Sequence, residues 1–268
     1  MALQNTQIIS VINQKGGVGK TTTVINLATA LSFQNKKVLV IDLDPQGNAT
    51  TGLGVSNDGD TKTIYDILNG NCNFHDAIKD TKIDNLKLIS SNVDLSGLEV
   101  ETASENRRAF LLKDKIDIFN NSSQNNFSYI FIDCPPSLNL LTVTSLVAAK
   151  SLIVPLQAEF FALEGLSQLM KTIDRIKIKL NPELELRGVL LTMFDKRNKL
   201  SNQVDLEARK FFNEKVYQTV IPRNVRLSEA PSHGVPILIY DKFCAGSKSY
   251  ASFAEEFLKQ ENIMESAA

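Results

Sequence analysis

The sequence predicts an α/β protein with a mostly parallel, twisted sheet and helices on both of its faces. Runs rich in Val, Ile and Leu recur along the 268 residues, and they are continuous rather than alternating, as in strands that are covered on both sides. Amphipathic segments lie between these runs. Strands that alternate with helices in this way form right-handed βαβ units and an open parallel sheet.

Each element can be assigned to a stretch of the chain. We expect strands at residues 8–12, 37–41, 86–89, 129–132, 152–155, 188–191 and 216–221. We expect helices at residues 22–33, 107–119, 164–180 and 202–213. The polar stretches 56–61 and 120–126 are expected to be surface loops. Because no linker is long and polar enough to separate two units, we expect one domain over residues 1–268, with a flexible tail of about eight residues.

Composition limits the class of protein. Hydrophobic residues make up 43%, enough for a buried core. No apolar run reaches the roughly 18–20 residues that span a bilayer, and the N-terminus lacks the pattern of an export signal. The three cysteines are far apart and form no C-x-x-C pair, which argues against a disulfide framework or a cysteine-ligated metal cluster. A cytoplasmic protein is therefore expected.

The net charge of −1 hides an uneven distribution. Residues 171–226 hold 13 Lys and Arg against 7 Asp and Glu, a balance of +6. A basic segment on a near-neutral protein can be the contact surface for a polyanion, or it can be a set of solvated helix faces.

The strongest local signal is a glycine-rich loop between the first strand and the first helix. Backbone N–H groups of such a loop surround phosphates, and the helix N-terminus adds partial positive charge. Lys20 is placed to contact the β- and γ-phosphates, and the Thr21 hydroxyl is a ligand for Mg²⁺. The usual spacing G-x-x-x-x-G-K-[ST] requires glycine at position 14, where this chain has Gln14, and a lysine follows at position 15. The loop predicts a P-loop protein that binds ATP and Mg²⁺.

This loop resembles the deviant Walker A motif of the ParA/MinD family of P-loop ATPases. The matching residues, all expected to contact nucleotide, are Lys15, Gly16, Gly17, Val18, Gly19, Lys20, Thr21 and Thr22. In the resemblance, Lys15 corresponds to the signature lysine of the family. The resemblance implies that Lys15 crosses a dimer interface to the phosphates of the partner's ATP. The residues alone would also allow Lys15 to be an ordinary solvated lysine of the loop.

Two further strand ends carry carboxylates. Asp42 and Asp44 follow the strand at 37–41 and point to the same side, so both can face the nucleotide. The resemblance ties Asp44 to hydrolysis and Mg²⁺, whereas capping of the next helix is the alternative for either residue. Asp133 follows four apolar residues as in a Walker B segment, and we expect it to reach Mg²⁺ through water or through Thr21. Cys134 is expected to be a small buried residue.

The segment 221–234 is very similar to one in chromosome-partitioning ParA (Soj) proteins, and the similarity extends over nearly the whole chain. It implies adenine contacts at Pro222 and Asn224, with residues 193–195 as a possible wall for the base. The basic residues that we expect to contact DNA phosphates are Arg223, Arg226, Lys196, Arg197 and Lys199.

The resemblance implies an ATPase that uses Lys15, Lys20 and Asp44 and that segregates DNA. ATP would drive formation of a homodimer that binds double-stranded DNA without sequence preference, and a ParB-type partner would stimulate hydrolysis and reset the cycle. The protein would then be cytoplasmic and nucleoid-associated. The alternative is a MinD-like ATPase that cycles on membranes, but it requires a basic amphipathic helix at the C-terminus, and residues 259–268 are mildly acidic. No membrane contact is expected.

Overall fold

A computed structural model describes residues 6–58, 61–122 and 125–267. Its centre is a seven-stranded sheet in the order β3-β4-β2-β5-β1-β6-β7. Six strands are parallel, and the edge strand β3 is antiparallel to β4. The strands are β1 (Gln7–Val11), β2 (Val38–Asp42), β3 (Ile78–Asp80), β4 (Leu86–Ile89), β5 (Tyr129–Asp133), β6 (Ser151–Gln157) and β7 (Glu185–Thr192). The predicted fold class is confirmed.

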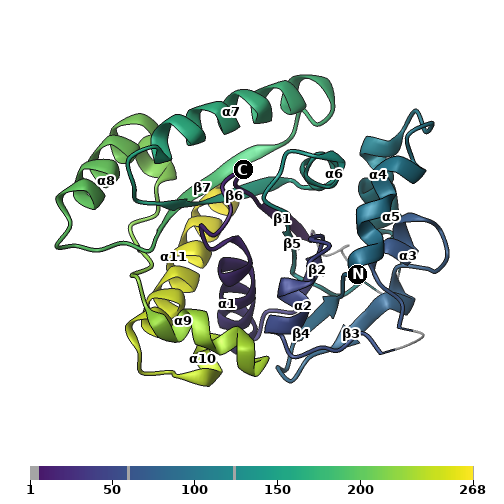
Figure 1. Cartoon of the computed structure of the whole chain (residues 1–268), viewed down its shortest axis with the longest axis horizontal. Coiled ribbons are helices and arrows are strands. Elements are labelled where there is room, and N and C mark those ends of the chain that lie inside the picture. Colours follow the sequence, from purple (N-terminus) through teal and green to yellow (C-terminus); the bar gives the residue numbers. More distant parts are fainter. Residues whose placement is uncertain (1–5, 59–60, 123–124, 268) are drawn as a thin grey trace.

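Helices cover both faces of this sheet (Figure 1). On one face α1 (Lys20–Phe33), α9 (Val225–Glu229), α10 (Ile237–Tyr240) and α11 (Ala245–Ala267) enclose one apolar core. On the other face α5 (Leu111–Asn120), α6 (Leu140–Ala148), α7 (Ala162–Lys179) and α8 (Lys199–Phe212) enclose a second core. Shorter helices are α2 (Asn48–Gly52), α3 (Ile64–Leu68) and α4 (Leu98–Glu101). The continuous apolar runs of β2 and β5 are buried at every position, because both of their faces are covered.

The order of the strands creates a crevice at the carboxyl ends of the central strands. From β1 the chain crosses to β2 on one side, whereas β6 and β7 lie on the other side of β1. Ligands of open α/β sheets bind where the direction of winding changes in this way. The predicted loop 15–22 follows β1 and therefore lies at this point.

The predicted strand at 216–221 is wrong. Within the described residues this part of the chain forms no continuous ladder with β7: Val216 makes an isolated bridge to Val189, and Pro222, just beyond the segment, makes another to Phe194. The ladder is interrupted because the N–H groups of Gln218 and Thr219 donate to the carboxylate of Glu256 on α11 instead of to β7. The segment still lies beside β7, since Tyr217 and Ile221 donate to its carbonyls.

At the C-terminus, helix α11 continues to Ala267. The flexibility of the last residues, about eight, stays a prediction. Glu261 of this helix is buried and contacts both Arg187 and the Tyr129 hydroxyl, which attaches this part of the helix to the sheet. Residues 59–60 and 123–124, inside the two predicted loops, lie outside the described residues. Over the described part of the chain, no helix has both the length and the apolar character to cross a membrane.

Candidate nucleotide-binding site

The loop between β1 and α1 has the backbone that a phosphate-binding loop needs. Gly17 and Gly19 have φ of 74° and 89°, values that a side chain disfavours. Gly19 is the N-cap of α1 and has no side chain to cap the helix, so the first N–H groups of α1 remain for a ligand. The hydroxyl of Thr192, at the end of β7, donates to the Val18 carbonyl at 2.8 Å and fixes the loop to the sheet.

Two lysines of this loop have different surroundings. Lys20 is buried, and its ammonium donates to the Lys15 carbonyl at 3.2 Å. Burial lowers the Lys20 pKa, and the charges of Asp133, Cys134 and Asp44 oppose the shift. Lys15 is exposed instead, and its ammonium forms an ion pair with Glu159, which follows β6. Lys20 thus belongs to the cradle of its own loop, whereas the Lys15 side chain lies outside it.

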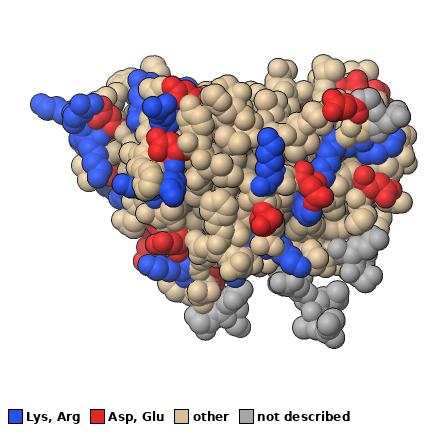
Figure 2. Space-filling view, turned by 90° about the horizontal axis from the view of Figure 1, so that it is seen from below, with Lys and Arg blue, Asp and Glu red and all other residues tan. Residues whose placement is uncertain are grey.

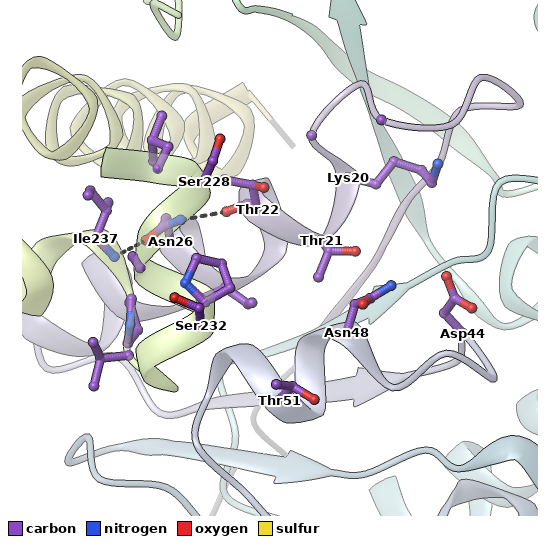
Figure 3. A pocket seen from close by; sticks show the side chains of 18 of the residues that line it. Lys20, Thr21, Thr22, Asn26, Asp44, Asn48, Thr51, Ser228, Ser232 and Ile237 are labelled. Carbon is purple, nitrogen blue, oxygen red and sulfur yellow. Dashed lines mark hydrogen bonds between the residues drawn. The ribbon is translucent and has the colours of Figure 1, made fainter. Parts of the chain in front are cut away.

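A cavity of about 530 Å³ opens beside the loop. Lys20, Thr21 and Asp44 face the same space in it (Figure 3). The lining residues from the predicted loop are Gly16, Gly17, Gly19, Lys20, Thr21 and Thr22. Val18 is buried under the loop and Lys15 projects away, so the structure brings six of the eight predicted loop residues to the cavity wall.

The two carboxylates at the end of β2, Asp42 and Asp44, have different surroundings. Asp42 is fully buried and accepts hydrogen bonds from the N–H and the hydroxyl of Thr50, at 2.8 and 2.7 Å. Asp42 thereby anchors α2 and does not line the cavity. Asp44 lines it, and one of its oxygens accepts from the Gln46 N–H at 3.0 Å. Capping is therefore the observed role of Asp42, and Asp44 is the carboxylate available to a ligand.

Asp133 is the most unusual group at the site. It is fully buried, and within the described residues neither carboxylate oxygen makes a hydrogen bond of good geometry, so the nearby Thr21 hydroxyl is at most a weak partner. Burial raises its pKa well above the ordinary value, and the neighbouring charge of Asp42 adds to the rise, while the Thr21 hydroxyl opposes it. A buried carboxylate without a partner is costly unless a cation compensates it.

This carboxylate fits a Mg²⁺ site of the P-loop type. No cluster of three or more His, Cys, Asp or Glu in the described ranges is arranged to hold a metal. Mg²⁺ needs no such cluster, because it keeps several waters and binds through one or two protein groups together with substrate phosphates. Thr21 and Asp44 line the cavity, and Asp133 is buried next to Thr21 without being part of the cavity wall.

The far wall of the cavity was missed by the sequence analysis. It consists of α9, the following turn 230–233 and the start of α10, and its lining residues are Leu227, Ser228, Ala230, Pro231, Ser232, Val235, Pro236 and Ile237. Asn26 of α1 joins this wall to the loop: it accepts from the Ile237 N–H and donates to the Thr22 carbonyl, both at 2.8 Å (Figure 3). The signal available in the sequence was the small and apolar stretch after residue 226.

The predicted adenine contacts lie outside this wall. Pro222 pairs with Phe194, and Asn224 caps α9 by accepting from the Arg226 N–H at 2.9 Å. Neither residue is part of the cavity lining, although Met193 is. Asn224 therefore sets where α9 begins, and its contact with adenine stays a prediction.

The predicted DNA-binding residues are all exposed. The N–H of Arg223 donates to the Phe194 carbonyl, so the stretch 223–226 lies next to the stretch 196–199. Figure 2 shows blue Lys and Arg side chains, with red Asp and Glu among them, at the left end of the molecule, where α8 and α9 lie. Two of the five residues are already paired: Arg226 with Glu229 at 2.9 Å, and Arg197 with Asp195 at 3.1 Å. Lys196, Lys199 and Arg223 form no ion pair among the described residues.

Fold and site together define a P-loop nucleotide-binding protein. A family model described as an AAA domain matches residues 6–186. The chain is 49% identical to the chromosome partitioning protein ParA of Caulobacter vibrioides over 100% of both chains. It is 48% identical to the sporulation initiation inhibitor protein Soj of Bacillus subtilis, over 93% of this chain and 97% of that protein. The chain belongs to the ParA/Soj family of chromosome-partitioning ATPases.

Solved structures agree with this fold. Cobyrinic acid a,c-diamide synthase from Mycobacterium smegmatis, solved with a bound ATP analogue and magnesium, superposes with a TM-score of 0.83 at 34% identity. The match covers 95% of this chain and 94% of that one. The recognition of the ParA/MinD family from the motif at 15–22 is confirmed.

Proposed function

We propose that this chain is an ATP-driven switch that partitions DNA. It is an ATPase with ATP and Mg²⁺ as cofactors. In the proposed cycle ATP binding joins two copies, the dimer binds DNA without sequence preference, and hydrolysis separates the copies. A ParB-type partner stimulates hydrolysis, and the protein acts in the cytoplasm on the nucleoid.

The residues of the cavity divide the chemistry among them. The loop N–H groups and Lys20 hold the β- and γ-phosphates. Thr21, Asp44 and Asp133 are the residues that would hold Mg²⁺, directly or through water, and the bound ion would supply positive charge to the phosphates. Asp44, at the cavity wall, orients the attacking water. The buried carboxylate of Asp133 is the observation that carries this assignment, because burial disfavours its charged form and a cation bound beside it would restore that form.

The place of Lys15 supports the proposed dimer. Its backbone is part of the phosphate loop, but its side chain points away from its own cavity to Glu159 at the surface. A cation in this position completes a site only when a second copy closes against the loop. It then supplies positive charge to the partner's phosphates, as an arginine finger does in trans.

Lys196, Lys199 and Arg223 are the best placed to contact DNA, because they are exposed and unpaired within the described chain. Two copies present two such patches, and joined patches bind a polyanion far more tightly than either alone. This links DNA binding to the nucleotide state.

A mixing experiment tests Lys15 directly. One subunit carries Lys15→Ala and keeps its own ATP site, and the other carries Lys20→Ala and keeps Lys15. If Lys15 acts in trans, the mixed dimer has one complete site and regains ATPase activity that neither variant has alone. If Lys15 acts within its own subunit, mixing restores nothing.

DNA binding is measured with ATP and with ADP, over a series of salt concentrations, in the presence and absence of liposomes. The proposal predicts binding with ATP only, with an affinity that falls as salt rises. Replacing Arg223 with Glu should weaken it without affecting dimerisation. Liposome binding in place of DNA binding would support the membrane-cycling alternative.

A further inference from the structure

Two neighbouring phenylalanines project from the side of the protein where the carboxyl ends of the strands and the nucleotide site lie. Phe160 and Phe161 are 75% and 70% exposed, and their rings pack edge to face with centroids 4.9 Å apart. They lie in the short connection between β6 and α7. Hydrogen bonds from the Ala162 N–H to the Glu159 carbonyl and from the Gly165 N–H to the Phe161 carbonyl fix this turn, so the exposed rings stand on an ordered backbone.

This aromatic pair is adjacent to Lys15. Glu159, the residue just before the pair, forms the ion pair with the Lys15 ammonium. The loop is also attached to β6 by its backbone and by Asn13: the Ile12 N–H donates to the Ile153 carbonyl, and the Asn13 amide donates to the Pro155 carbonyl at 2.7 Å. The phosphate loop and the aromatic pair therefore belong to one surface.

The rest of this surface, around the mouth of the cavity, is uncharged. Gly16, Gly17, Pro136 and Ser137 are exposed on it and carry no charge. Single exposed apolar residues are ordinary, but aromatic residues are enriched at protein interfaces, and a few of them supply most of the binding energy. Glu159 forms an ion pair with Lys15 and directly precedes Phe160 in the chain. A partner that covers the Lys15 side chain therefore also approaches the two rings.

We propose that Phe160 and Phe161 are the aromatic anchor of the ATP-dependent contact between two copies of this chain. The inference rests on the proposed function, since that function brings a second copy over Lys15. In a twofold contact each copy presents the same patch, so both pairs enter the interface. Nucleotide contacts alone then do not hold the dimer, and the rings exclude water around the two sites.

The test compares the double variant Phe160→Ser/Phe161→Ser with Phe211→Ser. Phe211 is a matched control, because it is 69% exposed and also packs against a neighbouring ring, that of Phe212, but lies on α8. Sedimentation velocity with AMPPNP and Mg²⁺ gives the dimer dissociation constant of each protein. Binding of a fluorescent ATP analogue to dilute monomer, and circular dichroism, show whether the site and the fold are intact.

We expect the double variant to raise the dimer dissociation constant at least about tenfold, as truncation of interface anchors does. Nucleotide binding by its monomer and the dimerisation of the Phe211 variant should stay unchanged. A double variant that dimerises like the wild type overturns the inference and leaves the proposed function standing. The inference is also overturned if the double variant still dimerises but no longer binds phosphatidylglycerol vesicles that the wild type binds. A wild type that stays monomeric with AMPPNP removes the proposed function and the inference with it.

Discussion

Gly234 should tolerate no side chain, because two parts of the site touch there through their backbones. Its φ of 62° is in the left-handed region, and a Cβ added to it would lie 2.9 Å from the Cα of Gly54. Gly54 has φ of 70° and follows α2, so this contact joins the segment after Asp44 to the far wall of the cavity. Neither backbone can move without moving part of the site.

The cost of Gly234→Ala follows from these two features. A non-glycine residue in the left-handed region loses roughly 1–2 kcal/mol. Overpacking against a backbone that cannot yield adds roughly 1–3 kcal/mol. We therefore expect the free energy of unfolding to fall by about 3 kcal/mol. Pro231, Ser232 and Val235, on either side of Gly234, line the cavity, so ATP affinity should fall as well.

Urea denaturation followed by circular dichroism measures the stability, and isothermal titration calorimetry measures ATP binding. Gly165→Ala is the control: it lies in α7, has no atom within 4 Å of an added Cβ, and should be neutral or stabilising by up to about 1 kcal/mol. If Gly234→Ala unfolds at the same urea concentration as the wild type and binds ATP equally well, the close approach of the two glycines is not a feature of the folded protein.

Three further predictions concern buried groups. Burial raises the Asp42 pKa to about 6 from an ordinary 3.8, so its protonated form favours folding. Without Mg²⁺ and nucleotide, the free energy of unfolding should fall by roughly 2 kcal/mol as the pH rises from about 4 to about 6.5. Urea titrations across this range check it, and a stability that rises throughout would contradict it. Asp133→Asn should stabilise the ligand-free protein but weaken Mg²⁺-dependent nucleotide binding about 10- to 100-fold, while Asp80→Asn at the exposed sheet edge changes neither. Cys134 is buried and its pKa is raised to about 12, so iodoacetamide should label it only after unfolding; fast labelling of the native protein would argue against its burial.

The parts of the fold that the sequence predicted are those with strong local patterns. Six of the seven predicted strands and all four predicted helices exist, because continuous apolar runs and amphipathic periodicity reflect burial directly. The antiparallel strand β3 was missed, since its Ile-Lys-Asp sequence has no strand pattern and pairs only as an edge. The predicted strand at 216–221 failed for the opposite reason: its apolar pattern is real, but Glu256, distant in sequence, takes its N–H groups.

The residues of the site also fall into those that local sequence patterns predict and those that contacts distant in sequence place. The phosphate loop could be predicted, because glycine spacing and a lysine at a strand end are local features. Asp133 could be located, but its lack of a well-formed hydrogen bond depends on three strands meeting. The wall from Leu227 to Ile237 could not be predicted, because its place is set by the bond from Ile237 to Asn26, 211 residues away. The ion pairs of Arg226 with Glu229 and of Arg197 with Asp195 are local, and the sequence analysis did not consider them.

The central claim is that ATP binding drives dimerisation and that Lys15 of each copy contacts the nucleotide of the other. Light scattering coupled to gel filtration measures the mass of the protein with AMPPNP and Mg²⁺, with ADP, and without nucleotide. The account predicts twice the 29.7 kDa chain mass with AMPPNP and the single mass otherwise, and Lys15→Ala should keep the single mass in all three conditions. A dimer that forms without nucleotide, or one that Lys15→Ala forms as readily as the wild type, would contradict it.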